Sequence, residues 1–247
     1  SSPVLGGEYH KRWKKVTIVY GDMRKWNPPQ QADILVSEML GSFGDNELSP
    51  ECLQGIEGKV LKSSGVSIPQ NYTSYLAPVF TCKLYNQLLK ENKENYFEIP
   101  YVVAFKDHWV THSPQPCFVF THPSTSSGVK ENGDPDFHNT RFAELRFPNT
   151  STHCLVHGFA GYFHSVLYAD VVLCTVPSMH HPKAMVSWFP IYFPIRNPLQ
   201  VKQGDDLAVH IWRSESLDKV WYEWTLEHNQ VLLPITNPTG RSYTIGL

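Results

Sequence analysis

The chain has 247 residues, of which 41% are hydrophobic and 18% charged, as expected of a folded protein with one large core or two modest ones. Its net charge of −2 shows no excess of basic residues, which argues against a nucleic-acid partner. The five cysteines are widely spread without a C-x-x-C pair, which argues against a disulfide framework or a structural zinc site. No apolar run approaches the roughly 20 residues of a membrane span, so we expect no membrane partner and a reducing intracellular compartment.

Two acidic residues are expected at the ends of successive strands near the start of the chain. Residues 1–15 show no clear period and are interpreted as a loose lead-in, and the β-branched residues 16–20 predict a strand that ends before Asp22. The apolar residues 34–36 predict a second, buried strand that ends before Glu38. Because ligands bind outside the carboxyl ends of strands in open α/β sheets, Asp22 and Glu38 indicate one crevice. Taken alone, Asp22 is more often a turn residue or a helix cap.

A short loop between two acids follows the second predicted strand. Residues 37–48 read S-E-M-L-G-S-F-G-D-N-E-L, with Glu38 and Glu47 at the two ends. Gly41 and Gly44 allow a sharp turn that brings Glu47 back toward Glu38. Two carboxylates in this arrangement can clamp a guanidinium, whose rigid fork of five donors suits paired acceptors. A solvated acidic loop is an equally good interpretation of the spacing alone.

A helix and a last strand are predicted after the loop. Ser49 is a good N-cap and Pro50 a good first helical residue, so we expect a helix that runs to about Leu61. Residues 63–65 are expected to stop this helix. Residues 66–69 then predict a short strand that leads out of the sheet.

From residue 70 onward the pattern changes to short apolar or alternating runs broken by Pro, Gly, Asn and Asp. Such runs predict an antiparallel sheet that closes into a barrel or sandwich. The polar stretch 84–96 is the exception, and we expect it to be partly helical and to project from the body. Residues 124–137 predict a mobile loop. The predicted strands are residues 73–80, 101–105, 117–121, 141–147, 152–157, 168–176, 191–194, 207–212 and 220–226.

The string S-E-M-L-G-S-F-G-D-N-E-L-S-P-E-C-L at residues 37–53 resembles the double-glutamate loop of protein arginine methyltransferases, specifically the type II family that makes symmetric dimethylarginine. The likeness continues in V-S-I-P, Y-V-V, H-G-F-A-G-Y-F, S-W-F-P and the terminal N-P-T-G-R-S-Y-T-I-G-L. It implies an α/β + β fold: the C-terminal portion of a Rossmann-like S-adenosylmethionine-dependent methyltransferase sheet in residues 1–68, then an antiparallel β-barrel or sandwich domain in residues 69–247. It also implies a dimerisation arm at about residues 84–96.

The resemblance assigns roles to individual residues. Ser187 stands where asymmetrically dimethylating relatives carry a histidine, and a smaller side chain leaves room for a methylated guanidinium to turn. Trp188 could stack on the guanidinium or simply pack in the barrel. The implied catalytic residues are Glu38 and Glu47; the implied substrate-binding residues are Glu38, Met39, Glu47, Ser187, Trp188 and Phe189; and the implied cofactor-binding residues are Asp22, Met23 and Glu38.

The resemblance also implies cofactor, partners and location. The cofactor is S-adenosylmethionine, with S-adenosylhomocysteine as product, and the substrates are histone tails and Gly/Arg-rich proteins. The whole enzyme is implied to be a homo-oligomer of cytoplasm and nucleus, with a WD-repeat propeller partner on an N-terminal domain that this sequence lacks. The glycine motif, the ribose-binding acid and the helix over the active site are also not found here. We therefore expect a C-terminal part of such an enzyme, not competent by itself.

Three questions remain open at this point. His157 opens H-G-F-A-G-Y-F and is either a structural residue or a proton-accepting accessory group. His108 and His112 have H-x-x-x-H spacing, but a third ligand is not evident and no metal is expected. Two rival functions are a non-catalytic β-barrel peptide-binding module or degenerate paralogue, and a carboxylate metal site. The residues of that metal site would be Asp22, Glu38, Asp45 and Glu47.

Overall fold

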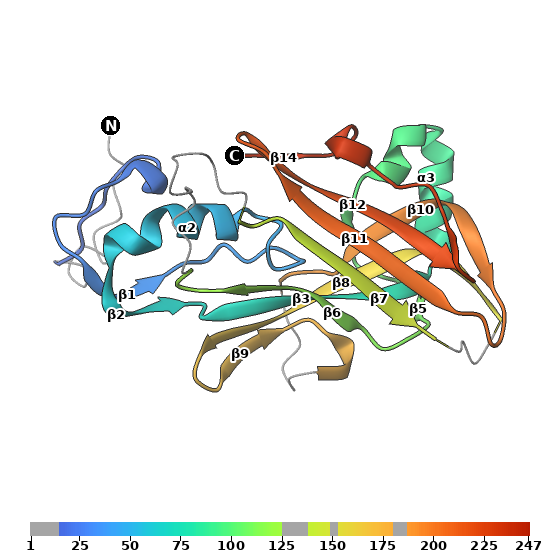
Figure 1. The fold of residues 1–247 in the computed structure, drawn as a ribbon, viewed down its shortest axis with the longest axis horizontal. Coiled ribbons are helices and arrows are strands. Elements are labelled where there is room, and N and C mark those ends of the chain that lie inside the picture. The colour runs from blue at the N-terminus through green and yellow to red at the C-terminus, as the bar shows by residue number, and fades with distance from the viewer. Residues whose placement is uncertain (1–14, 125–137, 149–152, 180–186) are drawn as a thin grey trace.

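The computed structural model describes residues 15–124, 138–148, 153–179 and 187–247. A small parallel sheet and one helix lie at one end of the elongated molecule, and two antiparallel sheets and a second helix make up most of the remainder (Figure 1). The confirmed part of the expected fold is this order, a small α/β portion followed by antiparallel β-structure.

The α/β portion is a parallel strand pair joined by a helix. Strand β1 (Ala32–Val36) pairs in parallel with β2 (Leu61–Ile68), and α2 (Ser49–Val60) lies between them in the chain. A parallel pair needs such a crossover, because its strands run in the same direction. The helix buries Ile56 and Val60 against Leu35 of β1.

Two expectations for this portion are wrong. Residues 16–20 form no strand, because they have no hydrogen-bonded neighbour in the described part of the chain and their side chains are exposed. Strand β1 does form, but it is not buried: Ile34 and Val36 are 58% and 69% exposed. The reason is the size of the sheet, since two strands and one helix cannot cover both of its faces.

The ends of α2 also differ from the prediction. The N-cap is Leu48, in a left-handed conformation (φ 64°), and Ser49 is the first helical residue. The Ser49 hydroxyl bonds the Tyr72 hydroxyl at 2.5 Å and so does not cap the helix. At the other end no connecting stretch stops the helix: β2 begins at Leu61, so residues 63–65 lie inside the strand. The predicted strand at residues 66–69 is only the last part of β2.

Two antiparallel sheets form the larger portion of the molecule (Figure 1). In the first, the order β4-β10-β8-β3-β5 is extended by β6, which pairs with β3, and β9, which pairs with β8. In the second, β14 joins the order β13-β12-β11-β7 by pairing with β12. The first sheet contains β3 (Asn71–Phe80), β4 (Tyr101–Val102), β5 (Trp109–Val110), β6 (Gln115–Thr121), β8 (Cys154–Tyr168), β9 (Val171–Cys174) and β10 (Ile191–Val201); the second contains β7 (Arg141–Phe147), β11 (Leu207–Glu215), β12 (Lys219–His228), β13 (Val231–Leu232) and β14 (Ile245–Gly246). Four 3₁₀ turns complete the described elements: η1 (Met23–Lys25), η2 (Glu94–Glu98), η3 (Pro177–Met179) and η4 (Pro238–Gly240).

The two sheets enclose one aromatic core, as in a sandwich. Phe163 and Phe193 come from the first sheet and Tyr222 and Trp224 from the second, and all four are buried. Phe43, from the loop between β1 and α2, is buried among them. The core of the β-portion is therefore completed by a residue of the α/β portion.

The strand prediction is inaccurate in number as well as in length: nine strands were predicted after residue 70, whereas the described residues form twelve there, and β5, β13 and β14 were not predicted. The longest strand, β8, contains the whole H-G-F-A-G-Y-F motif and runs on to Tyr168, where the sequence predicted only residues 152–157. Conversely, two strands are shorter than predicted. The strand predicted at residues 101–105 ends at Val102 (β4), and the one predicted at residues 168–176 ends at Cys174 (β9). Glycine-rich and aromatic stretches have no clear alternation, which is why their pairing could not be anticipated. The loop predicted at residues 124–137 lies outside the described residues except for Ser124.

Helix α3 (Cys82–Glu91) and η2 confirm the helical character of residues 84–96 but not the expected projection. Leu84 and Leu88 pack against the buried cluster around Tyr162. The Tyr85 hydroxyl donates a hydrogen bond to the Arg196 carbonyl of β10 at 2.9 Å. The helix is therefore held against the first sheet, at the end of the molecule away from β1 (Figure 1). Its predicted role as a dimerisation arm stays a prediction.

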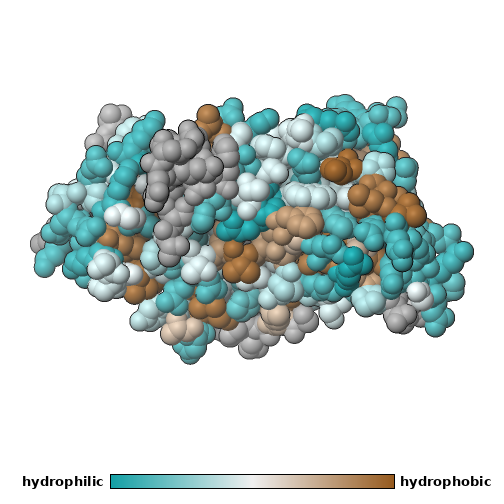
Figure 2. All heavy atoms as spheres, viewed as in Figure 1, coloured by the Kyte–Doolittle hydropathy of each residue, from teal (hydrophilic) through white to brown (hydrophobic). Residues whose placement is uncertain are grey.

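The surface is mostly polar on the side viewed in Figure 2, where apolar residues occur in small groups among hydrophilic ones. Within the described ranges, the longest helices are α2 and α3, and none is long and apolar enough to cross a membrane.

Candidate active site

The loop between β1 and α2 is a compact turn held by its own backbone. Gly41 and Gly44 exchange two backbone hydrogen bonds, of 3.1 and 2.8 Å. The Asn46 side-chain oxygen accepts from the Phe43 N–H at 2.6 Å, and the Leu48 N–H donates to the Asp45 carbonyl at 3.2 Å. Such local bonds leave the loop few alternative conformations.

The two predicted catalytic acids lie at the ends of this loop and close to each other. Glu38 and Glu47 are both exposed, and among the described residues neither carboxylate has a hydrogen bond or an ion pair. Partial burial and then repulsion from Glu38 raise the pKa of Glu47 above its ordinary value. Two like charges without a partner cost free energy, which a cationic ligand between them would offset. The structure thus brings together the acids that the sequence predicted as a pair.

Phe43 anchors the loop in the sandwich. Its side chain is fully buried and meets Phe193 and Tyr222 edge-to-face, with ring centroids 5.2 and 5.8 Å apart. Gly161 of β8 leaves the space for it, since a Cβ there would lie 2.7 Å from the Phe43 ring. Gly44 has φ +86°, a conformation that favours glycine. A Cβ at Gly44 would also lie 2.9 Å from the Tyr72 ring, so both glycines permit close packing of the loop on the first sheet.

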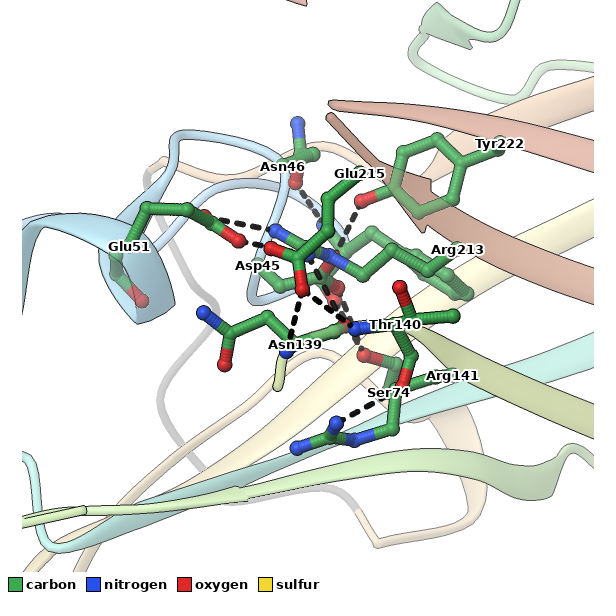
Figure 3. A network of polar contacts seen from close by, with 12 residues as sticks. Asp45, Asn46, Glu51, Ser74, Asn139, Thr140, Arg141, Arg213, Glu215 and Tyr222 are labelled. Atoms are coloured by element: carbon green, nitrogen blue, oxygen red, sulfur yellow. Dashed lines mark hydrogen bonds and ion pairs between the residues drawn. The ribbon is translucent and has the colours of Figure 1, made fainter. Parts of the chain in front are cut away.

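Asp45 is fully buried, whereas Glu47 is exposed, and Asp45 joins a buried polar network (Figure 3). Its Oδ2 accepts from Arg213 Nε at 2.5 Å and from the Tyr222 hydroxyl at 2.6 Å. Its Oδ1 accepts from the Ser74 hydroxyl at 3.2 Å. Arg213 in turn binds both oxygens of Glu51 on α2, at 2.8 and 2.9 Å. The network thus links the loop, α2 and both sheets.

The charges of this network hold one another in place. Burial opposes the positive charge of Arg213, but the attraction of Asp45 and Glu51 overcomes it and keeps the pKa of the guanidinium well above its usual value. Burial, and then the charge of Asp45, raises the pKa of Tyr222, so this hydroxyl stays a donor.

Arg213 and its partners were not singled out from the sequence, although a signal exists. In β11, Leu207, Val209 and Ile211 alternate on the buried side, and Arg213 continues that series. An arginine at an interior position of a strand indicates a buried ion pair. Which acid it meets, 168 positions away, could not be inferred from spacing.

The S-W-F segment lies against the loop, as the predicted site requires. Trp188 Nε1 donates to the Leu40 carbonyl at 2.5 Å, and its ring meets Phe163 edge-on. Ser187 and Phe189, on either side, are exposed, with Phe189 54% exposed. Both interpretations of Trp188 therefore retain support, because it packs on the core and also borders the acidic loop. Met39 is half-buried between Glu38 and the buried Leu40.

Asp22 and Met23 lie on the turn η1, which packs on α2. Asp22 caps this turn by accepting from the Arg24 N–H at 3.0 Å, and its carboxylate also pairs with the Arg24 guanidinium. The hydrogen bonds from Arg24 lower the pKa of Asp22. The interpretation of Asp22 as a helix cap is thus confirmed, and its cofactor contact stays a prediction. A shallow depression beside it is lined by residues 17, 19–23, 25 and 26.

His157 belongs to another part of the molecule. It lies on β8 four residues before Gly161, or roughly 13 Å along an extended strand. The residue is buried, with its ring between Phe80 and Tyr85, and Nδ1 accepts from the Thr81 N–H at 3.2 Å. Burial lowers its pKa below the ordinary value. These contacts favour the structural role, and the structure does not bring His157 to the acidic loop.

The structure excludes Asp45 as a ligand of the carboxylate metal site, one of the rival functions. Asp45 is fully buried and bonded to Arg213, Tyr222 and Ser74, so it cannot join Glu38 and Glu47 around an ion. Among the described residues no group of three or more His, Cys, Asp or Glu side chains could hold a metal.

Two solved structures of arginine methyltransferases share this arrangement of elements. A Trypanosoma brucei PRMT1 enzyme–prozyme complex with AdoHcy matches with a TM-score of 0.67 at 16% identity, over 97% of this chain and 75% of that one. Arabidopsis thaliana protein arginine methyltransferase 10 matches with a TM-score of 0.66 at 17% identity, over 89% and 72%. At these identities the matches define the fold alone.

Sequence comparison defines the family within this class. The family model "PRMT5 oligomerisation domain" matches residues 71–245, and "PRMT5 arginine-N-methyltransferase" matches residues 4–68. Protein arginine N-methyltransferase 5 of Xenopus laevis is 48% identical over 98% of this chain, and protein arginine N-methyltransferase skb1 of Schizosaccharomyces pombe is 43% identical over 85%. The chain belongs to the PRMT5 family, the type II arginine methyltransferases, as the motifs predicted. It spans 37% and 34% of the length of these two relatives.

Proposed function

We propose that this chain is the C-terminal catalytic part of a methyltransferase that transfers methyl groups from S-adenosylmethionine to arginine nitrogens of Gly/Arg-rich proteins and histones. The observation that carries this proposal is the pair Glu38 and Glu47, two neighbouring carboxylates that are exposed and without a partner among the described residues. A perturbed pKa in a pair of like charges is typical of a functional site, and a cation between the two carboxylates would offset their repulsion.

The two acids would position the guanidinium rather than activate a cofactor. Each carboxylate can accept two N–H groups of a planar guanidinium, which directs one nitrogen toward the methyl carbon. The nitrogen–carbon bond forms as the carbon–sulfur bond breaks, so the alignment of three atoms decides the rate. Glu47, whose pKa is raised by partial burial and then by Glu38, can accept the proton that the methylated nitrogen releases.

The residues at η1 fit one edge of the cofactor. Asp22 and Met23 border the shallow depression, and a bound S-adenosylmethionine would supply the electrophilic methyl group on sulfonium. The carboxylate of Asp22 is already paired with Arg24, so contact with an adenine would come from the turn as a whole. We propose that β1 and β2 belong to a larger Rossmann-like sheet, since β1 leaves Ile34 and Val36 exposed.

Symmetric dimethylation is the proposed outcome, with monomethylarginine as the intermediate product. Ser187 is small and exposed next to Trp188, whose indole is fixed by the Leu40 carbonyl. A small side chain beside a fixed ring leaves space for a monomethylated guanidinium to turn and present its other terminal nitrogen.

The whole protein is proposed to act as a homo-oligomer in cytoplasm and nucleus. The family model over residues 71–245 is described as an oligomerisation domain, which supports self-association of the sandwich portion. A WD-repeat propeller protein is proposed as a partner of the N-terminal domain that precedes this region in the family.

The test is transfer of a labelled methyl group to an Arg-Gly-rich peptide by the full-length protein that carries this chain, compared with the chain alone. Mass spectrometry identifies the product, and we expect symmetric dimethylarginine from the full-length protein only. Glu38→Gln removes one charge at nearly constant shape and should lower the rate at least a hundredfold, because the nucleophile is no longer aligned.

Glu144→Gln is the control, since Glu144 is an exposed acid on β7 that pairs with Arg146 away from the loop. Its activity should equal that of the wild type. Retention of the rate within a few fold by Glu38→Gln would refute the role of the acid pair, and asymmetric product would refute the assignment of Ser187. A full-length protein that binds the cofactor and the peptide but transfers no methyl would favour the non-catalytic module.

A further inference from the structure

Glu47 is placed by a residue that lies outside the acidic loop. We infer that Arg213, on β11 of the second sheet, is a positioning residue that sets the location of Glu47 through its buried pair with Asp45. This inference rests on the proposed function of the acidic loop and adds a determinant of its geometry in the opposite part of the chain.

The first step of the argument is the direction of the two acids. Asp45 and Glu47 are two positions apart on one turn, and one is fully buried while the other is exposed. Asn46 lies between them, and its side-chain oxygen accepts a hydrogen bond from the Phe43 N–H. Leu48 follows them as the N-cap of α2, in a left-handed conformation. Any rotation of Asp45 about the backbone therefore moves Glu47 as well.

The second step is that Asp45 has one position available. Its Oδ2 lies 2.5 Å from Arg213 Nε and 2.6 Å from the Tyr222 oxygen, and all three side chains are fully buried. A buried carboxylate cannot exchange these donors for water, so it stays where the guanidinium holds it.

The third step is that Arg213 itself is held on more than one side. Glu51 of α2 accepts from both Nη atoms, and the Asn139 carbonyl accepts from Nη1 at 3.2 Å (Figure 3). The flat fork of an arginine can meet two carboxylates in one plane, whereas a lysine ammonium cannot reproduce that geometry. The second sheet, α2 and the loop are thus joined at one guanidinium.

The consequence is that different parts of the fold position the two acids of the loop. Glu38 follows β1 directly, so its place is set by the parallel sheet. Glu47 is set by the sandwich, through Asp45 and Arg213. The distance between the two carboxylates, and hence the size of the cation they can clamp, depends on how the sandwich is docked against the α/β portion.

The experiment measures loop protection and turnover in the full-length protein that carries this chain. Tyr222→Phe removes one hydrogen bond to Asp45 and keeps the ring, and Arg213→Lys keeps the charge but not the fork. Hydrogen exchange of the peptides covering residues 41–48 should accelerate in both variants, and kcat should fall at least tenfold at a temperature where both remain folded. Tyr101→Phe, which removes a hydroxyl bonded to the Tyr96 carbonyl at 2.8 Å, is the matched control and should change neither.

A pH profile adds a readout that a general loss of stability would not move. Burial and, second, repulsion from Glu38 raise the pKa of Glu47. If Glu47 leaves Glu38 and becomes more exposed, both causes weaken, and the acid limb of kcat/KM moves to lower pH in Tyr222→Phe. Unchanged protection of residues 41–48, or faster exchange with kcat within twofold of wild type, overturns the inference. If the wild type itself transfers no methyl group, the proposed function fails, whereas the exchange comparison still decides whether Arg213 and Tyr222 hold the loop.

Discussion

His157 illustrates at the scale of one residue how a titratable group can serve packing. Its ring lies between Phe80 and Tyr85, and its Nδ1 satisfies the Thr81 N–H, which would otherwise be a buried donor without an acceptor. A buried imidazole is most stable without charge, which is why burial lowers its pKa.

The lowered pKa of His157 predicts a pH dependence of stability. The unfolded chain binds a proton at this histidine below about pH 6.5, while the folded chain binds it only at lower pH. The contribution of His157 is therefore fully present above pH 6.5 and is lost as the pH falls toward its folded value. His157→Gln keeps an acceptor for Thr81 and does not titrate, so its free energy of unfolding should decline less than that of the wild type between pH 7 and 5, as measured by urea denaturation.

The same variant separates the two roles of His157. Methyl transfer by full-length His157→Gln should stay within threefold of wild type at pH 8, because the imidazole is remote from the acidic loop. A loss above tenfold with unchanged stability would instead support the accessory role in proton acceptance.

At the scale of elements, the acidic loop packs against β8 because β8 has a glycine, Gly161, at the point of contact. A Cβ added at Gly161 would lie 2.7 Å from Phe43 of the loop on one side and 2.6 Å from Ile191 of β10 on the other. Both neighbours are buried, so they have little space to move.

Gly161→Ala is therefore expected to destabilise the protein by about 1–3 kcal/mol, because the added methyl group overpacks the core. The loop would also lose its anchor, so kcat should fall together with the melting temperature. Gly58→Ala on α2 is the matched control: nothing lies within 4 Å of the place its Cβ would take, and the change should stabilise the helix by about 0.5–1 kcal/mol. Equal melting temperatures for Gly161→Ala and wild type would contradict the packing argument.

At the scale of the whole molecule, α2 connects the α/β portion to the sandwich through two acids. Glu51 binds Arg213, and Glu57 lies at the other end of the helix. Glu57 accepts from the Ser67 hydroxyl at 3.0 Å and the Ser124 N–H at 2.7 Å, and its Oε1 lies 3.2 Å from His122 Nδ1. Since Glu57 and His122 are buried, they give the two portions a second polar contact that water does not reach, in addition to that of Arg213.

Glu57→Leu should destabilise the protein by about 3–5 kcal/mol, because it leaves buried donors without an acceptor. Glu57→Gln retains an amide oxygen and should cost less. Calorimetry should show a broadened or split transition for Glu57→Leu as the two portions lose their coupling. Glu91→Gln, an exposed acid on α3, is the control. A single sharp transition at the wild-type temperature would refute this role of Glu57.

The sequence by itself determined the family, the order of α/β and β portions and the acidic pair, because these depend on local features. Glu38 and Glu47 are close since they end one short loop, and their spacing along the chain carries that information. The β-branched and alternating runs similarly predicted most strands of the sandwich within a few residues.

Only the tertiary structure decided which residues support the site. Arg213 reaches Asp45 across 168 positions, and Gly161 makes room for Phe43, because sheets bring distant segments together in a register that no local pattern specifies. The errors have the same origin. Residues 16–20 have strand-forming side chains but no neighbouring strand in the described structure, and Ser49 has a better partner in Tyr72 than in its own helix. Propensity states what a segment can form, and the available partners decide what it does form.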